Sequence, residues 1–179
     1  MRPRIRHSSF ALLSCLLACQ PHTTRPPFPP VTGAPEVELE LTPARATELL
    51  AEAFRAEGLP VGRVVVRDAW LETPWFDAAS LRPTDARRLG PDVVRVRAWA
   101  DPTRPRHSRV TVETLFRPLA DPSLPERELD RQVPPDHPVA KRVQAALNRL
   151  VDAYGEPAPA RDTTASPSPA SPGEGTKPR

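Results

Sequence analysis

The cysteines are the side chains of this 179-residue chain with the most distinctive chemistry, and both, Cys15 and Cys19, lie near its start. Three arginines precede a short apolar run, residues 10–17, which is followed by Ala18 and Cys19. A charged start, an apolar run and small residues at a cleavage point are typical of a secretory signal. The run is shorter than the ~20 apolar residues that a membrane-spanning helix needs. The sequence therefore predicts export, with cleavage between Ala18 and Cys19.

The end of this segment, Leu16-Leu17-Ala18-Cys19, resembles the lipobox of bacterial lipoproteins. The resemblance implies that the signal is cut before Cys19 and that the thiol and the new amino group of Cys19 are then acylated, as with palmitate. The sorting rule of that family implies the outer membrane, facing the periplasm, because Gln20 and not an aspartate follows the cysteine. Plain secretion, with a chance cysteine near the cleavage site, is the alternative. We expect a protein that is anchored to a membrane of the cell envelope through its acylated cysteine.

The signal also accounts for the net charge of the chain. The 25 Lys and Arg residues exceed the 22 Asp and Glu residues by three, and residues 1–18 contain three arginines and no acidic residue. The remainder is therefore neutral, which removes the reason to expect a nucleic-acid partner from a basic chain. Without Cys15, and with Cys19 acylated, no thiol is left for a disulfide or a cysteine zinc site.

Catalytic chemistry is poorly represented in the rest of the chain. His107 and His137 are the only histidines of the predicted folded region, whereas a zinc site needs three or four convergent ligands. Ser80 or Ser108 could be combined with His107 into a triad, but neither serine lies in a nucleophile-elbow sequence. The glycines fall in no phosphate-binding pattern. We expect a protein that is not an enzyme and has no metal or cofactor, with an unrecognised hydrolase as a less favoured alternative.

Composition divides the chain into four segments. Residues 1–18 are the predicted signal peptide, and residues 19–35 are the lipidated cysteine with a Pro-rich linker. In the polyproline II conformation this linker could hold a domain ~50 Å from its anchor. Residues 36–155 carry nearly all the large apolar side chains, enough for one core. Residues 156–179 are rich in Pro, Ser and Ala and are predicted to be a disordered tail.

The predicted domain begins with a strand and a helix. Residues 36–41 alternate Glu with Val or Leu, which is typical of a half-exposed strand. Thr42 and Pro43 supply a helix N-cap and a proline at the first helical position. Gly58 is predicted to end this helix.

Three further strands are predicted at residues 63–71, 92–100 and 109–117. The turn-rich residues 101–108 suit an antiparallel hairpin between the last two. Val94, Val96 and Ala98 would lie on the buried side of the sheet.

The closing helix is predicted from residue 138 to 154, with Asp136 as its cap and Gly155 at its end. The preceding residues, 118–135, are predicted to be a long loop. We therefore expect an α+β two-layer sandwich with an antiparallel sheet of about four strands. Two helices would lie on one face of this sheet, in the order β-α-β-β-β-α.

Aromatic and arginine side chains form a candidate docking site for an envelope protein. One interpretation is that the aromatic rings seal the core, and the arginines of the 92–100 strand and Arg109 face Glu113 in ordinary cross-strand pairs. The other interpretation is an exposed docking patch, because Trp and Arg are enriched at binding hot spots. The candidate residues are Trp70, Trp75, Phe76, Trp99, Arg95 and Arg97.

A second resemblance concerns the folded region. A helix ending in Glu57-Gly58-Leu59-Pro60, a strand leading into Leu71-Glu72-Thr73-Pro74-Trp75-Phe76, an Arg/Val hairpin and a closing helix follow one another. This order resembles the helix-grip-type modules of accessory lipoproteins of the outer-membrane barrel-assembly machine. The resemblance implies a binding or scaffolding accessory with an envelope protein partner.

Two binding functions therefore stay open. A scaffold predicts an exposed patch at Trp75 and Phe76 and no sizeable cavity, whereas a small-ligand binder predicts an apolar pocket of several hundred Å³. An enzyme would need two or more titratable groups that converge in a cleft.

Overall fold

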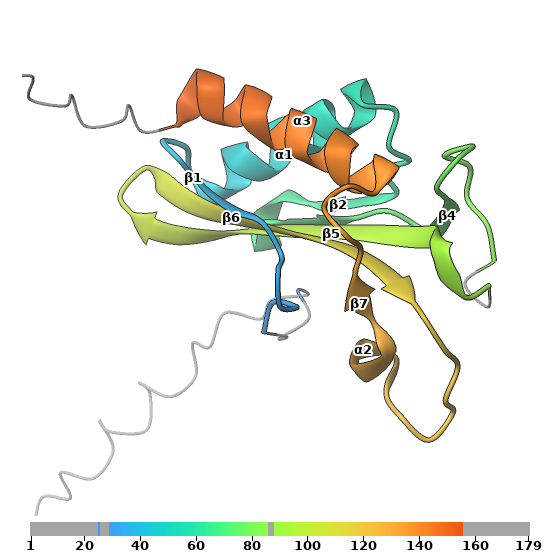
Figure 1. Ribbon diagram of the computed structural model, residues 1–179. Helices are drawn as coiled ribbons and strands as arrows, with labels where there is room; N and C mark the ends of the chain where they lie inside the picture. The colour runs from blue at the N-terminus through green and yellow to red at the C-terminus, as the bar shows by residue number, and fades with distance from the viewer. Residues whose placement is uncertain (1–24, 26–28, 86–87, 156–179) are drawn as a thin grey trace, which may run out of the picture.

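The computed structural model describes residues 25, 29–85 and 88–155. In these residues two long helices, α1 and α3, lie on one face of an antiparallel sheet (Figure 1). The elements in chain order are β1 (Glu36–Leu39), α1 (Pro43–Ala56), β2 (Arg63–Val65), a 3-10 turn (Val66–Asp68), β3 (Trp70–Glu72), β4 (Phe76–Asp77), β5 (Gly90–Arg104), β6 (His107–Arg117), α2 (Glu126–Leu129), β7 (Arg131–Gln132) and α3 (Pro138–Tyr154).

The sheet has more strands than the sequence predicted. Within the described residues it has seven, in the order β1-β6-β5-β3-β2, with β4 paired to β5 and β7 paired to β6. The α+β class is confirmed, whereas the prediction of about four strands and their order is wrong. One reason is that the predicted strand 63–71 is broken by the 3-10 turn and by Ala69, which has a left-handed φ of 52°. The chain reverses there, so that Val65 pairs with Trp70 across a hairpin.

The hairpin of β5 and β6 is confirmed, but most of its predicted loop is strand. Asp101 lies opposite Arg109 and Pro102 lies opposite Ser108, so the ladder continues almost to the tip. A register shift after Pro102 accommodates the prolines, which cannot donate to a ladder. The turn itself is Pro105 and Arg106, and Arg106 has a left-handed φ of 63°.

The ends of the long helices follow local capping signals. The Thr42 hydroxyl accepts a hydrogen bond from the Arg45 amide, and α1 ends just before Gly58, whose φ is +78°. The cap of α3 is His137 and not the predicted Asp136, because the ring Nδ1 of His137 accepts from the Val139 amide at 3.2 Å. Gly155 ends α3 as predicted.

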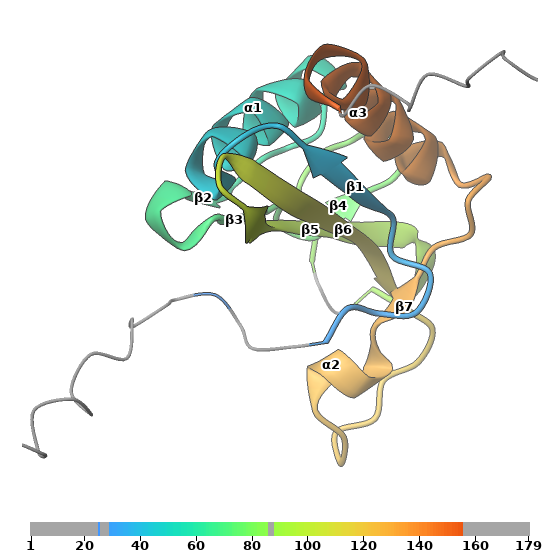
Figure 2. The ribbon, with the colours of Figure 1, turned by 90° about the vertical axis from the view of Figure 1, so that its left-hand side faces the viewer.

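The predicted loop 118–135 contains α2 and β7. These elements are too short to carry a periodic signal, and tertiary pairing of β7 with Leu115 and Phe116 of β6 stabilises them. Figure 2 shows α1 and α3 above the sheet, with β7 and α2 reaching below it. The last part of the chain thus contributes to both sides of the sheet.

The core lies between the helices and the sheet. Leu50 and Phe54 of α1 and Leu147 of α3 pack with Val96 and Val112 of the central strands, and all five are buried. Alternation along β5 and β6 places every second side chain in this core. The remaining side chains of these strands point to the opposite side, which we call the open face.

Candidate functional site

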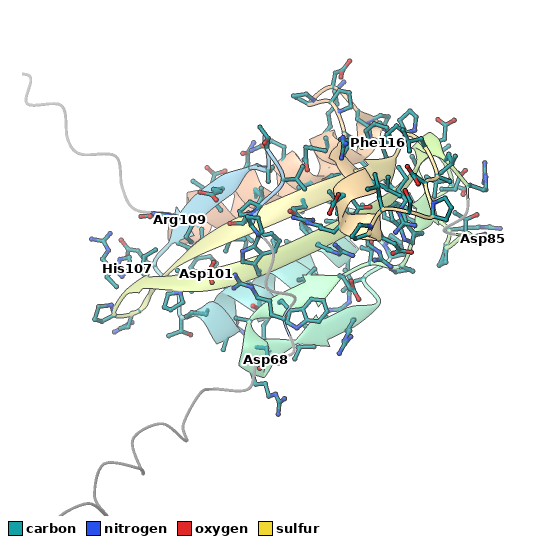
Figure 3. The ribbon with its side chains drawn as sticks, turned by 90° about the horizontal axis from the view of Figure 1, so that it is seen from below. Asp68, Asp85, Asp101, His107, Arg109 and Phe116 are labelled. Atoms are coloured by element: carbon teal, nitrogen blue, oxygen red, sulfur yellow. The ribbon has the colours of Figure 1, made fainter. Side chains whose placement is uncertain are left out.

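The open face carries the charged and aromatic side chains that the sequence singled out, and Figure 3 looks onto it. β3, β5 and β6 run side by side there, so residues distant in sequence become neighbours. The register places Trp70 opposite Trp99 and Arg97 opposite Glu113. The central residues of this face are Trp70, Glu72, Arg95, Arg97, Trp99, Asp101, Glu113 and Arg117.

The candidate aromatic side chains are buried. Trp70 is 4%, Trp75 5% and Trp99 9% exposed, and Phe76 lies in the core below the helices at 0%. An exposed aromatic patch is therefore not formed by these rings. Their burial favours the interpretation in which they seal the fold.

Each tryptophan of the open face is covered by a guanidinium group. Arg63 lies 4.9 Å from the ring centre of Trp70, and Arg25 lies 5.3 Å from that of Trp99. Cation–π contacts of this kind are attractive and shield the ring from water. The tryptophans are thus held by arginines of the same chain.

Trp75 is contacted by two arginines, Arg95 at 5.1 Å and Arg117 at 4.7 Å from its ring centre. Arg117 also donates to Asp130 at 3.2 Å and to Glu126 at 2.6 Å. Burial lowers the pKa of Arg95, and the neighbouring positive charge of Arg97 lowers it further.

Arg97 does not pair with Glu113, although the two are opposite each other in the ladder. Its guanidinium lies 3.6 Å from Glu72 and 3.7 Å from Asp130. Arg109 pairs with Glu38 of β1 at 2.8 Å. The predicted pairing of these arginines with Glu113 is therefore wrong, because carboxylates from other segments are closer.

Glu113 is fully buried, and its hydrogen-bond donors come from α2 and from the residues that precede β1. Arg127 of α2 donates to both carboxylate oxygens, at 2.5 and 2.7 Å, and the Val31 amide donates at 2.8 Å. Arg127 also donates to the Pro29 carbonyl at 2.7 Å, and its hydrogen bond with Glu113 raises the pKa of Arg127. Residues before β1 and residues of α2 thus close over one end of the open face. Sequence reasoning missed Arg127 and Asp130 because both lie in the predicted loop.

The histidines contact main-chain carbonyls rather than a nucleophile. His107 Nδ1 lies 2.9 Å from the Pro105 carbonyl, and His137 Nε2 lies 3.0 Å from the Pro91 carbonyl. The Ser80 hydroxyl donates to Asp77 at 2.9 Å. Within residues 25, 29–85 and 88–155, no group of three His, Cys, Asp or Glu side chains could hold a metal ion.

A cavity of about 420 Å³ lies beside α3. At this place two different strands pair with the outer edge of β6. β1 pairs with residues 108–111 of β6, whereas β7 pairs with Leu115 and Phe116. Between them, the Val112 amide donates to the Pro35 carbonyl and the Thr114 amide donates to the Gln132 side chain, both at 3.0 Å. The interruption of the strand edge leaves a hollow that α3 borders.

The walls of this cavity are mainly apolar and include a few polar side chains. Pro35, Thr114, Val133 and Val143 are among the residues that line it. The Thr114 side chain is buried, and its hydroxyl oxygen has no hydrogen-bond partner in the described part of the chain. Lys141 is the one charged side chain among the described residues that line the cavity. The sequence offered no signal for this site, because its residues come from four separate segments.

A second hollow, of about 600 Å³, lies at the end of the sheet opposite the hairpin tip. Leu89, Leu119 and Leu124 line it, and each is more than 40% exposed. These three residues form what we call the leucine patch. They are the most exposed of the large apolar side chains among the described residues.

The predicted cleavage and lipidation residues, Ala18 and Cys19, lie outside the described residues. In the described residues, no helix has the length and hydropathy needed to cross a membrane. Comparison of the chain with family models, with curated proteins and with solved structures gave no match in any of the three.

Proposed function

We propose that this chain is a lipid-anchored protein of the cell envelope whose domain binds a small amphiphilic molecule, without catalysis, in the cavity beside α3. The observation that carries the proposal is an apolar hollow of about 420 Å³ in which Lys141 is the one charged side chain among the described lining residues. Cavities of 300 to 1,000 Å³ with apolar walls and a few polar groups are typical of small-molecule sites.

The chemistry of the lining favours a ligand with an apolar body and one anionic group. The mainly apolar walls favour an aliphatic or aromatic body, because removing apolar surface from water is favourable. Lys141 supplies a positive charge, and none of the described lining residues is a carboxylate. A carboxylate or sulfonate with an aliphatic or aromatic body fits these features.

The anchor is supported by the sequence around Cys19. The basic start, the short apolar run and Leu16-Leu17-Ala18-Cys19 favour export and acylation, and Gln20 favours the outer membrane, facing the periplasm. Mass spectrometry of the mature N-terminus tests this part, with an acylated Cys19 as the expected result. An intact Met1 or an unmodified Cys19 would contradict it.

Binding can be measured with anilinonaphthalene sulfonate, a fluorescent probe that has an aromatic body and a sulfonate group. We expect the full chain to bind the probe in a saturable manner and decanoate to displace it. Ala145→Phe, which places a ring at the cavity rim, should weaken probe binding at least tenfold. Ala153→Phe is the matched control, because Ala153 is exposed on the same helix and does not line the cavity. Equal affinities of the two variants would refute the site.

Lys141→Gln separates the ligand contact from the fold. Lys141 is exposed on α3, and the glutamine keeps a long polar side chain while it removes the positive charge. We expect unchanged stability together with weaker displacement of the probe by decanoate. Displacement equal to that of the wild type would show that Lys141 does not contact the carboxylate.

A scaffolding role is the second candidate, and the leucine patch favours it. Three exposed leucines around one hollow could receive an apolar segment of an envelope protein. Photo-crosslinkers at Leu119 and Leu124 should then capture one and the same protein in the native envelope, and a crosslinker at Ala153 should not. Different products from the two leucine positions would contradict a defined partner.

A further inference from the structure

We infer that the open face and the tip of the β5–β6 hairpin lie against the phospholipid surface that holds the anchor. The inference rests on the proposed acylation of Cys19. It adds a second contact with the membrane, made by headgroup phosphates and arginine side chains of the folded domain.

The first step is the position of Arg25. Its guanidinium pairs with Asp101 of β5 through both terminal nitrogens, with Nη2 at 3.3 Å from Oδ2, and lies 5.3 Å from the ring centre of Trp99. Arg25 therefore docks on the open face near the hairpin. Closer to β1, the contacts of Pro29 and Val31 with Arg127 and Glu113 attach the same segment to the domain again.

The second step is the length of chain between the anchor and this contact. Arg25 follows Cys19 by six residues, and an extended chain spans at most ~3.6 Å per residue. The distance from Cys19 to Arg25 is therefore about 22 Å or less, much shorter than the ~50 Å that a free linker of residues 19–35 would allow. The domain cannot stand far from the membrane while Arg25 stays docked.

The third step is orientation. Arg25 contacts Trp99, which alternates with the core residues Ala98 and Ala100 along β5 and therefore lies on the side of the sheet opposite to α1 and α3. A short tether that leaves from this side turns the open face toward the bilayer and the helices away from it. The cavity beside α3 then stays accessible from the solvent.

The fourth step is the chemistry of the surface that faces the lipid. Arg104 and Arg106 are exposed at the hairpin tip, and His107 follows them on β6 (Figure 3), whereas Arg109 is paired with Glu38. The nearby carboxylate of Asp101 is paired with Arg25. Guanidinium groups bind phosphate oxygens with paired hydrogen bonds, and basic residues close to an anionic membrane surface are attracted to it.

Fluorescence quenching can test this orientation, because Cys19, whose thiol the proposed acylation consumes, is the only cysteine of residues 19–179. The lipidated protein is placed in vesicles of phosphatidylethanolamine and phosphatidylglycerol that contain a lipid with a nitroxide on its headgroup. A fluorophore is attached through Arg106→Cys or, as matched control, through Arg55→Cys on the exposed side of α1. We expect quenching at position 106 to be at least twice that at position 55. Equal quenching, or stronger quenching at position 55, would overturn the inference.

The tether is tested by adding Arg25→Ala to both labelled proteins. Loss of the contact with Asp101 lengthens the free chain, so the difference in quenching between positions 106 and 55 should fall by half or more. Arg45→Ala, which removes an exposed ion pair with Glu48 on α1, should leave the difference unchanged. A difference that persists in Arg25→Ala would refute the role of Arg25. A protein that fails to co-float with the vesicles indicates instead that the proposed acylation is absent.

Discussion

The ion pair of Arg127 and Glu113 offers a quantitative test of how the open face is held. The Glu113 carboxylate is buried and accepts three hydrogen bonds from described residues, two from Arg127 and one from the Val31 amide. Truncation in Arg127→Ala therefore leaves a buried negative charge with one donor. It also removes the contact with the Pro29 carbonyl.

The expected loss of stability follows from this burial. Removing one partner of a buried ion pair costs about 3–5 kcal/mol, because the remaining charge stays out of water. The Glu113 side chain is 1% and the Arg127 side chain 16% exposed, so water can reach the site from the side of Arg127. We therefore expect the lower end of the range, about 3 kcal/mol. At roughly 4 °C per kcal/mol for a domain of this size, Tm should fall by about 12 °C.

Urea unfolding followed by tryptophan fluorescence measures this change, with an unchanged m-value as the sign of a two-state comparison. Arg45→Ala is the control, because Arg45 and its partner Glu48 are both exposed and such surface pairs contribute little to stability. Glu113→Leu combined with Arg127→Leu should be more stable than Arg127→Ala, because no unpaired charge remains. Equal losses in Arg127→Ala and Arg45→Ala would refute the reasoning.

Three further predictions use the same unfolding assay. Trp75→Ala should lose about 3–5 kcal/mol, because a buried ring between two arginines is removed, whereas Trp75→Phe should lose less than half as much. Gly58→Ala should lose about 1–2 kcal/mol, since its φ of +78° is unfavourable for any residue with a Cβ, and an unchanged midpoint would contradict this. Hydrogen bonds from Ser80 lower the pKa of Asp77, so the folded state binds this proton less readily than the unfolded state and stability should fall as the pH drops below about 4. Asp77→Asn should reduce the loss between pH 5 and pH 3, and an equal loss in the two proteins would argue against the contribution of Asp77.

Features that depend on neighbouring residues were predictable. Thr42, Pro43 and Gly58 define the ends of α1 through capping and backbone geometry, which need no tertiary contact. The alternation of residues 92–100 and 109–117 placed the core side chains of β5 and β6 correctly. Local signals of this kind act within one element.

Features that depend on distant residues were not predictable. β7 and α2 are too short for a periodic pattern and exist because they pair with β6 and cover the open face. Ala69 adopts a left-handed backbone conformation, which could not be predicted from its residue type. The predicted strand 63–71 is therefore a hairpin of β2 and β3. The ion-pair partner of Glu113 is Arg127, which lies fourteen residues further along the chain in α2, and not the residue opposite Glu113 in the ladder.

The sequence by itself determined the neutral charge of residues 19–179 and the two amphipathic helices, and from it alone come the predictions of an export signal and of acylation at Cys19. Each of these properties depends only on the residue types and their spacing within one segment. Only the tertiary structure decided that Trp70, Trp75 and Trp99 are buried under arginines, and that a cavity lies beside α3. Both follow from where separate segments meet on one sheet, because burial and cavities are properties of surfaces brought together and not of any single stretch of chain.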